Sequence, residues 1–292
     1  DRKHITHLDG IAHLHDITLL QLANNQIADL TPLRELRHLH KLDLRNNAIR
    51  DLTPLADLTY LRELALRGNQ ITDLTPLAQL RYLQKLSLGS NPLADLTPLA
   101  NLSALTLLKV PNCALKNIEA LSTLHALVRF KASANQIRDI APLHTLSQLK
   151  HLNLWGNQIT DLTPLTNLTS LRHLSLATNN IHDLNALATL NHLHTLRLDD
   201  NLILDLNPLH NLNALTELRL AKNQLQDVSP LANLPLKILD LSHNQITDLT
   251  PLQNQTNLQT LRLAKNQIAD LSPLLDLSSL KVLEIWDNPL SP

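Results

Sequence analysis

The sequence predicts an α/β solenoid, with a parallel β-sheet on the concave face and 3₁₀ or short helical turns on the convex face. The segment at residues 149–170 recurs along nearly the whole chain, and its apolar residues keep the same offsets in each copy. In this copy Leu149, Leu152 and Leu154 are followed by Asn157. One unit of 22 residues is too small to bury its own leucines, so a fixed period of this kind requires neighbouring units to stack and cover one another.

Each repeat is expected to begin with one short strand. Successive side chains of a strand point to opposite faces, so Leu152 and Leu154 should face the core while His151, Asn153 and Trp155 face outward. Strands stacked about 4.8 Å apart would give one parallel sheet of roughly 13 strands. The outward positions of successive repeats would then form columns down the concave surface.

A column of asparagines ends the predicted strands, and Cys113 replaces asparagine in one repeat. A buried amide both donates and accepts hydrogen bonds, so it can satisfy the backbone groups of a turning loop. We therefore expect these asparagines to be structural. The repeat tolerates cysteine at this position, and we expect Cys113 to be structural rather than a reactive thiol.

The loop is followed by the pattern D-L-x-P-L, which predicts a helical turn. Proline costs no hydrogen bond at the first helical position, and Thr, Ser or Asn just before it is a favourable N-cap. The predicted N-caps of this kind include Thr31, Thr163, Asn207 and Ser229. About six residues remain before the next strand, which leaves room for a 3₁₀ or short helical turn and no more.

The repeats predict a single domain over residues 1–292. A partial repeat covers residues 1–16, twelve repeats cover residues 17–279, and a partial last repeat covers residues 280–292. The repeat that begins at Leu215 is one residue shorter than the others. No linker or low-complexity segment separates the repeats.

The period and the order L-x-x-L-x-L-x-x-N are the leucine-rich-repeat signature. Within it, the phrase NQITDLTPL at residues 69–77, 157–165 and 244–252 and the phrase DLTPLANL at residues 95–102 resemble the repeats of bacterial internalins. The resemblance covers nearly the whole chain and indicates a right-handed leucine-rich-repeat solenoid, or horseshoe. The eukaryotic phosphatase-1 regulatory subunit has repeats of the same length.

The resemblance implies a non-enzymatic recognition domain that binds a protein or peptide on its concave face. For the internalins it also implies a secreted or cell-surface location, an N-terminal helical cap and an Ig-like domain after the repeats. Two other functions stay open: an intracellular regulatory scaffold like the phosphatase subunit, and a structural spacer of a larger protein. A solenoid exposes its hydrophobic core at both ends unless caps cover them, so we expect either that flanking domains were removed or that the ends pack against another surface.

The outward columns are least uniform in the middle of the repeat array, and we place the partner site there. Exposed tryptophan beside arginine is typical of binding hot spots, and Trp155 is one of two tryptophans in the chain. Nine outward residues on five consecutive predicted strands make up the candidate site: Lys109, Arg129, Lys131, His151, Asn153, Trp155, His173, Ser175 and Arg197. The alternative is an ordinary solvated face on which Trp155 packs against the stems of its neighbours.

The composition argues against other classes of partner. The formal net charge is −1 without any block of like charges, which argues against bulk attraction to nucleic acid or anionic membranes. A local patch of one sign remains compatible with this total. No apolar run reaches the length of about 18 residues that a membrane-spanning helix needs, so no membrane insertion is expected. The single cysteine excludes an intrachain disulfide.

No enzymatic chemistry, cofactor or metal is expected. His151 and His173 should be neighbours about 5 Å apart, but two imidazoles without a third ligand make a poor zinc site. Ser133, Ser175 and Asp199 lie near histidines in projection, yet an open sheet does not exclude water as a catalytic site must. The four glycines are scattered along the chain and form no phosphate-binding loop.

Overall fold

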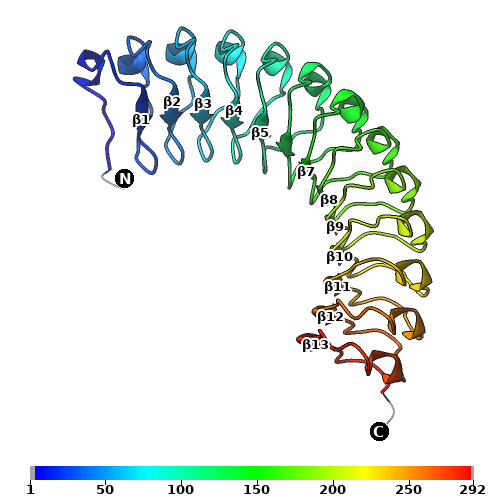
Figure 1. The fold of residues 1–292 in the computed structure, drawn as a ribbon. Coiled ribbons are helices and arrows are strands. Elements are labelled where there is room, and N and C mark those ends of the chain that lie inside the picture. Colours follow the sequence, from blue (N-terminus) through cyan, green and yellow to red (C-terminus); the bar gives the residue numbers. More distant parts are fainter. Residues whose placement is uncertain (1–3, 291–292) are drawn as a thin grey trace. The chain divides into compact units, whose positions relative to one another are not determined.

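The computed structural model describes residues 4–290, which form two compact units of stacked repeats: unit 1, within Asp1–Leu149, and unit 2, within Lys150–Pro292. The outer ends of the two predicted partial repeats, residues 1–3 and 291–292, lie outside the described residues. In each unit the strands line one side of the ribbon and the helical turns line the other (Figure 1). Each unit is therefore a leucine-rich-repeat solenoid, as predicted.

Within each unit the strands pair in parallel and in chain order, with equivalent residues of successive repeats in register. Leu20 pairs with Leu42 in unit 1, and Leu152 pairs with Leu174 in unit 2. The strands of unit 1 are β1 (Leu19–Gln21), β2 (Lys41–Asp43), β3 (Glu63–Ala65), β4 (Lys85–Ser87), β5 (Leu107–Lys109) and β6 (Arg129–Lys131). Those of unit 2 are β7 (His151–Asn153), β8 (His173–Ser175), β9 (Thr195–Arg197), β10 (Glu217–Arg219), β11 (Ile238–Asp240), β12 (Thr260–Arg262) and β13 (Val282–Glu284). The described residues thus contain 13 strands, the number that the repeat count predicts.

Every repeat returns through a 3₁₀ turn, as its length requires. In unit 1 these turns are η1 (Ile11–His13), η2 (Thr31–Leu33), η3 (Thr53–Leu55), η4 (Thr75–Leu77), η5 (Thr97–Leu99), η6 (Glu119–Thr123) and η7 (Ala141–Thr145). In unit 2 they are η8 (Thr163–Leu165), η9 (Asn185–Leu187), η10 (Asn207–Leu209), η11 (Ser229–Leu231), η12 (Thr250–Leu252) and η13 (Ser272–Leu274). None of the helical segments within residues 4–290 has the length and apolar character needed to cross a bilayer.

The predicted N-caps of these turns are wrong. Thr31 is the first residue of η2 rather than its cap, and the capping residue, Leu30, makes no side-chain hydrogen bond. The same correction applies to Thr163, Asn207 and Ser229. The side-chain acceptor is Asp29, whose Oδ1 accepts the backbone N–H of Thr31 at 2.8 Å. Aspartate readily bonds the backbone two residues further on, so the first residue of D-L-x-P-L, and not the third, closes the turn.

The core of each unit is aliphatic. Leu152 and Leu154 are 2% and 0% exposed, as the alternating pattern predicts, and the equivalent leucines of the other complete repeats are buried with them, except Leu20 in the first, which is partly exposed. Phe130 stands at a position that leucine occupies in the other repeats and is fully buried. Burial of a leucine side chain stabilises the fold by about 1.5–3 kcal/mol, so successive repeats hold one another in place along the unit.

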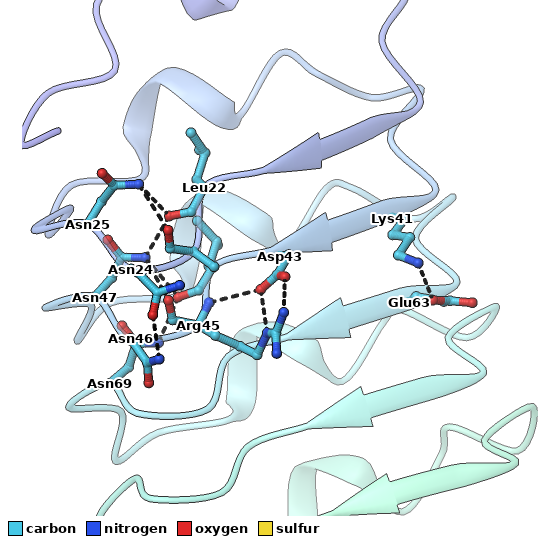
Figure 2. A network of polar contacts seen from close by, with 12 residues as sticks. Leu22, Asn24, Asn25, Lys41, Asp43, Arg45, Asn46, Asn47, Glu63 and Asn69 are labelled. Carbon is cyan, nitrogen blue, oxygen red and sulfur yellow. Dashed lines mark hydrogen bonds and ion pairs between the residues drawn. The ribbon is translucent and has the colours of Figure 1, made fainter. Parts of the chain in front are cut away.

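Within each unit, the members of the asparagine column join their repeat to the preceding one. The Nδ2 of Asn47 donates to the carbonyl oxygen of Leu22 at 3.0 Å (Figure 2). It also donates to the carbonyl oxygen of Leu44 at 3.0 Å, and the Oδ1 of Asn47 accepts the backbone N–H of Ile27 at 3.0 Å. Because Leu22 and Ile27 belong to the preceding repeat, one amide satisfies backbone groups of two repeats. Asn179 makes the equivalent bonds in unit 2. The predicted structural role of this column is confirmed.

Cys113 occupies the one position in the complete repeats where the column lacks asparagine. Its sulfur donates to the carbonyl oxygens of Leu88 and Pro111 at 3.5 and 3.4 Å, which are long, weak bonds. The N–H of Leu93, whose equivalents bond to an asparagine Oδ1, turns instead to the carbonyl oxygen of Asn91 at 2.9 Å. Burial raises the pKa of the Cys113 thiol, so the thiol stays protonated near neutral pH. These features fit the predicted structural role.

Candidate partner-binding face

Each repeat presents three outward positions: the first and third residues of its strand and the residue two positions beyond. On β7 these are His151, Asn153 and Trp155, which alternate with buried Leu152 and Leu154. Trp155 is the most exposed of the three, with 46% of its surface accessible. The predicted outward columns are therefore confirmed. We call the outward positions of one unit its sheet face.

The nine candidate residues all occupy outward positions, and they fall into two groups. The group in unit 1, on β5 and β6, consists of Lys109, Arg129 and Lys131. The group in unit 2, on and beside β7 to β9, consists of His151, Asn153, Trp155, His173, Ser175 and Arg197. That the two groups make up one patch stays a prediction, and each is described by itself.

The group in unit 1 is a cluster of cations. The register of β5 and β6 places Lys109 opposite Lys131 and places Arg129 opposite Leu107. Burial lowers the pKa of Lys109, and the positive charges of Lys131, Arg129 and Arg45 lower it further. No carboxylate pairs with Lys109, Arg129 or Lys131 among the residues that the structure describes.

The group in unit 2 begins with two histidines in ring contact. His151 and His173 face each other in the register of β7 and β8, and their imidazoles stack with centroids 4.6 Å apart and planes 6° from parallel. This agrees with the separation expected from the sequence. His194 adds a third ring, 6.5 Å from that of His173. Within residues 4–290, no group of three or more His, Cys, Asp or Glu side chains is placed to hold a metal ion.

Next to this pair the sheet face of unit 2 contains a hollow of about 450 Å³. Small side chains lie at its middle, at Ser175 and Ala177, and larger ones at Trp155, Arg197 and Asp199 stand around them. The lining is completed by Asn153, Thr178, Asp200, Arg219, Ala221 and Lys222. The hollow exists because one repeat has small residues at two outward positions where the flanking repeats have large ones.

Ion pairs and hydrogen bonds hold the rim of the hollow. Oε1 of Glu217 accepts from Nη2 of Arg197 at 3.0 Å and from Nε of Arg219 at 2.8 Å. Glu217 has only 18% of its side chain exposed, and one carboxylate therefore positions two guanidinium groups. On the opposite side, the backbone N–H of Trp155 donates to Oδ1 of Asn153 at 3.0 Å. This bond ties the backbone of the tryptophan to the adjacent outward residue.

Asp199 is one of the acidic groups around the hollow. Burial raises its pKa, and the negative charge of Asp240 raises it further, against the N–H of Ala221 and the charge of Arg219, which lower it. The bond from the Ala221 N–H to Oδ1 of Asp199 is 3.2 Å long.

Four of the nine candidates, namely Asn153, Trp155, Ser175 and Arg197, line the hollow. The candidate set omitted Asp199, Arg219 and the small residues Ala177 and Ala221. The contrast in side-chain size between neighbouring repeats of one column is the signal that could have found them.

The chain matches a family described as Leucine Rich repeats (2 copies), at residues 15–57, 59–101, 129–167, 147–189, 213–254, 236–276 and 256–292. Its structure is also similar to that of an internalin, inlF, from Listeria monocytogenes. The two share 38% sequence identity with a TM-score of 0.95, over 97% of this chain and 84% of that chain. The chain belongs to the internalin-type leucine-rich-repeat proteins.

Other solved structures resemble this internalin-type chain. Internalin C2 of Listeria monocytogenes is 36% identical, with a TM-score of 0.62 over 64% of this chain and 83% of that chain. A leucine-rich-repeat protein of Leptospira interrogans is 27% identical, with a TM-score of 0.92 over 98% and 82% of the two chains. The Arabidopsis receptor kinase HAESA, in complex with the peptide hormone IDA and the co-receptor SERK1, shares the fold at 23% identity and a TM-score of 0.78, over 94% and 50%. No curated protein sequence matches the chain significantly.

Proposed function

We propose that this chain is a non-enzymatic recognition protein that binds a protein or peptide partner on its sheet face. The observation that carries the proposal is the hollow of unit 2, where an exposed tryptophan and a fixed arginine border small residues. Solenoid proteins use their extended concave surfaces for binding. Tryptophan and arginine are also the residues most enriched at binding hot spots.

In this proposal the hollow receives a side chain or a short segment of the partner. Trp155 supplies apolar contact area, and Arg197 supplies donors that Glu217 already orients. The other candidates, Lys109, Arg129, Lys131, His151 and His173, contact the same partner outside the hollow. An open face of this kind does not exclude water, which favours binding over catalysis.

The relatives support the proposal in two ways. The plant receptor kinase HAESA holds a peptide hormone on the same fold, so the fold is suited to a peptide ligand. Internalins and the Leptospira protein are bacterial, and we propose a bacterial source for this chain as well.

We further propose that residues 1–292 form one folding domain, because the repeat period continues without a break from residue 149 to residue 150.

The test is partner capture with a variant of the hollow. The immobilised full chain and its Trp155→Ala/Arg197→Ala variant are exposed to the same protein extract, and retained proteins are quantified by mass spectrometry. Each candidate partner is then purified and its affinity is measured by calorimetry. We expect at least one partner to bind the wild type and to lose about tenfold or more in affinity for the variant.

A matched control removes one arginine and one aromatic residue from another surface. Arg81 and Tyr82 are both exposed and precede β4 outside the sheet face, and Tyr82 is 64% accessible. The Arg81→Ala/Tyr82→Ala variant should bind the partner as the wild type does. Equal affinity of the wild type and the Trp155→Ala/Arg197→Ala variant for every captured protein would contradict the proposed site.

A further inference from the structure

The sheet face of unit 1 carries a large excess of positive charge. Two carboxylates stand at its outward positions, Asp43 and Glu63. The cations at those positions number seven: Lys41, Arg45, Arg67, Lys85, Lys109, Arg129 and Lys131. The formal excess is thus five positive charges, on one face of a chain whose total formal charge is −1. A field of one sign concentrated on one surface favours ligands of the opposite sign.

Part of this face already shows how one carboxylate pairs with lysines of the two strands that flank it. Glu63 on β3 pairs with Lys41 on β2 at 3.2 Å and with Lys85 on β4 at 2.7 Å. Figure 2 shows the Lys41–Glu63 pair beside the Asp43–Arg45 pair. Hydrogen bonds from Lys85 and Lys41 hold the pKa of Glu63 below its ordinary value. A carboxylate bridging two strands is therefore a stable arrangement on this surface.

The lysines of β5 and β6 are adjacent and have no carboxylate between them. Lys109 lies directly opposite Lys131, and like charges facing each other across a strand pair are destabilising. Arg129 adds a third cation on the same two strands, and no carboxylate of the described residues pairs with any of the three. A hollow of about 160 Å³ extends over β2 to β5, and its lining includes Lys41, Glu63, Lys85 and Lys109.

We propose that Lys109, Arg129 and Lys131 bind the carboxylates of an acidic segment of a partner protein. This inference rests on the proposed function and gives the chemistry of the partner at unit 1. A partner carboxylate bound by Lys109 and Lys131 would pair with two lysines at once, as Glu63 does with Lys41 and Lys85, but here the lysines are on the adjacent strands β5 and β6. The repulsion between the opposed lysines is relieved only in the complex, so it contributes to the preference for an anionic partner.

A protein segment fits this face better than a nucleic acid does. Proteins that bind single strands combine a cationic groove with aromatic side chains on which bases stack. None of the outward positions of β1 to β6 holds an aromatic residue. The anion that this face binds within its own structure is a carboxylate of Glu63 or Asp43.

The inference is tested with a fluorescein-labelled octaglutamate peptide, whose binding to the full chain is followed by fluorescence anisotropy at about 50 mM salt, where screening is weak. The wild type should bind the peptide, and binding should weaken as salt is added. The Lys109→Gln/Lys131→Gln variant should lose about five- to tenfold in affinity. The Glu63→Gln variant, which releases Lys41 and Lys85 from their internal partner, should gain about two- to threefold.

A control with the same change in net charge keeps the test specific. Lys116 and Lys237 are exposed and lie outside the outward positions, so the Lys116→Gln/Lys237→Gln variant should keep wild-type affinity for octaglutamate. Circular dichroism establishes that each variant is folded. Equal affinity losses in the two double variants would overturn the inference, and so would tighter binding of octathymidylate than of octaglutamate.

The outcome is separable from that of the proposed function. The Trp155→Ala/Arg197→Ala variant should bind octaglutamate normally, since its substitutions lie in unit 2. If the wild type fails to bind octaglutamate while partner capture still depends on Trp155 and Arg197, the inference about unit 1 fails alone. If octaglutamate binds as expected while the Trp155→Ala/Arg197→Ala variant captures every partner as the wild type does, the proposed site in unit 2 fails alone.

Discussion

The sheet faces of the two units are built on the same repeat, yet their surfaces differ in kind. The outward positions of unit 1 carry a formal excess of five positive charges, and Lys109, Arg129 and Lys131 have no carboxylate partner among the described residues. Unit 2 has four acidic outward residues, Asp199, Glu217, Asp240 and Glu284, against three arginines, Arg197, Arg219 and Arg262. All three arginines are held in ion pairs, and this face offers instead stacked histidines, a tryptophan and a hollow.

The difference shows that scaffold and surface are specified separately. The leucines and asparagines of the two units are equivalent, so the outward residues can differ between the units while the scaffold stays the same. Each outward position lies about 4.8 Å from its equivalents on the neighbouring strands, and a face can therefore be composed residue by residue. The sheet face of unit 1 is distinguished by its positive charge, whereas the sheet face of unit 2 is distinguished by its shape.

The largest expected effect is a loss of stability, and it should be equal in the two units. Asn69→Ala in unit 1 and Asn179→Ala in unit 2 each remove a buried amide that makes three or more hydrogen bonds. The loss leaves buried backbone groups without partners, so each variant should lose about 2–4 kcal/mol of unfolding free energy. Guanidinium denaturation followed by circular dichroism measures both. A loss confined to one unit would show that the scaffolds are not equivalent.

A smaller effect should separate the shapes of the two faces. Ser175 on β8 and Ser87 on β4 are third residues of their strands and are equally half-buried. Ser175→Trp fills the hollow of unit 2 and should weaken partner binding at least about tenfold. Ser87→Trp, the matched substitution in unit 1, should weaken it less than about threefold. Calorimetry with the captured partner measures both affinities. A larger loss for Ser87→Trp than for Ser175→Trp would place the principal contact in unit 1.

The smallest expected effect is the change in stability on substituting two aspartates, Asp43 and Asp199, whose pKa values are shifted in opposite directions. Burial raises the pKa of Asp199. At Asp43 burial acts in the same direction, but the hydrogen bonds and charge of Arg45 outweigh it, so the pKa of Asp43 is lowered. Asp43 therefore stabilises the fold above its unfolded pKa of 3.8, and the contribution is lost as pH falls through the lower folded value. Asp199 behaves oppositely: its contribution is present below 3.8 and is lost as pH rises through the higher folded value.

Asparagine substitutions at these two positions should accordingly differ in sign. At pH 7, Asp43→Asn should destabilise the fold and Asp199→Asn should stabilise it, each by less than about 1 kcal/mol. Both differences should shrink as the pH approaches about 3, where both carboxyls of the unfolded chain are protonated. Denaturation midpoints of the three proteins across this pH range test the signs. Changes of the same sign at pH 7 would be inconsistent with the environments described.

Much of the fold could be predicted because the period ties each residue to its equivalents in other repeats. The strand count, the inward leucines and the asparagine column all follow from offsets that hold in every copy. The cap was predicted wrongly because Thr31 and Asp29 are both good side-chain acceptors. Only the observed start of η2 at Thr31 assigns the bond to Asp29.

The candidate site was predicted only in part, for a different reason. Outward positions are constrained by no period, so their residue types suggest chemistry but not shape. The hollow depends on Ser175 and Ala177 lying between larger neighbours. The separation of charged clusters depends on which carboxylate each cation reaches, as when Glu217 holds Arg197 and Arg219. These are relations between side chains of different repeats, and composition does not reveal them.

The break in the asparagine column at Cys113 gives unit 1 a built-in reporter of its own motion. The chain has no other thiol, and Cys113 is 2% exposed. A thiol reagent can therefore react only when the neighbouring repeats separate. Its rate of reaction with the native protein measures the free energy of that local opening. Because solenoid repeats contact only their neighbours, this rate would show whether a ligand bound at β5 and β6 tightens the repeats beneath it.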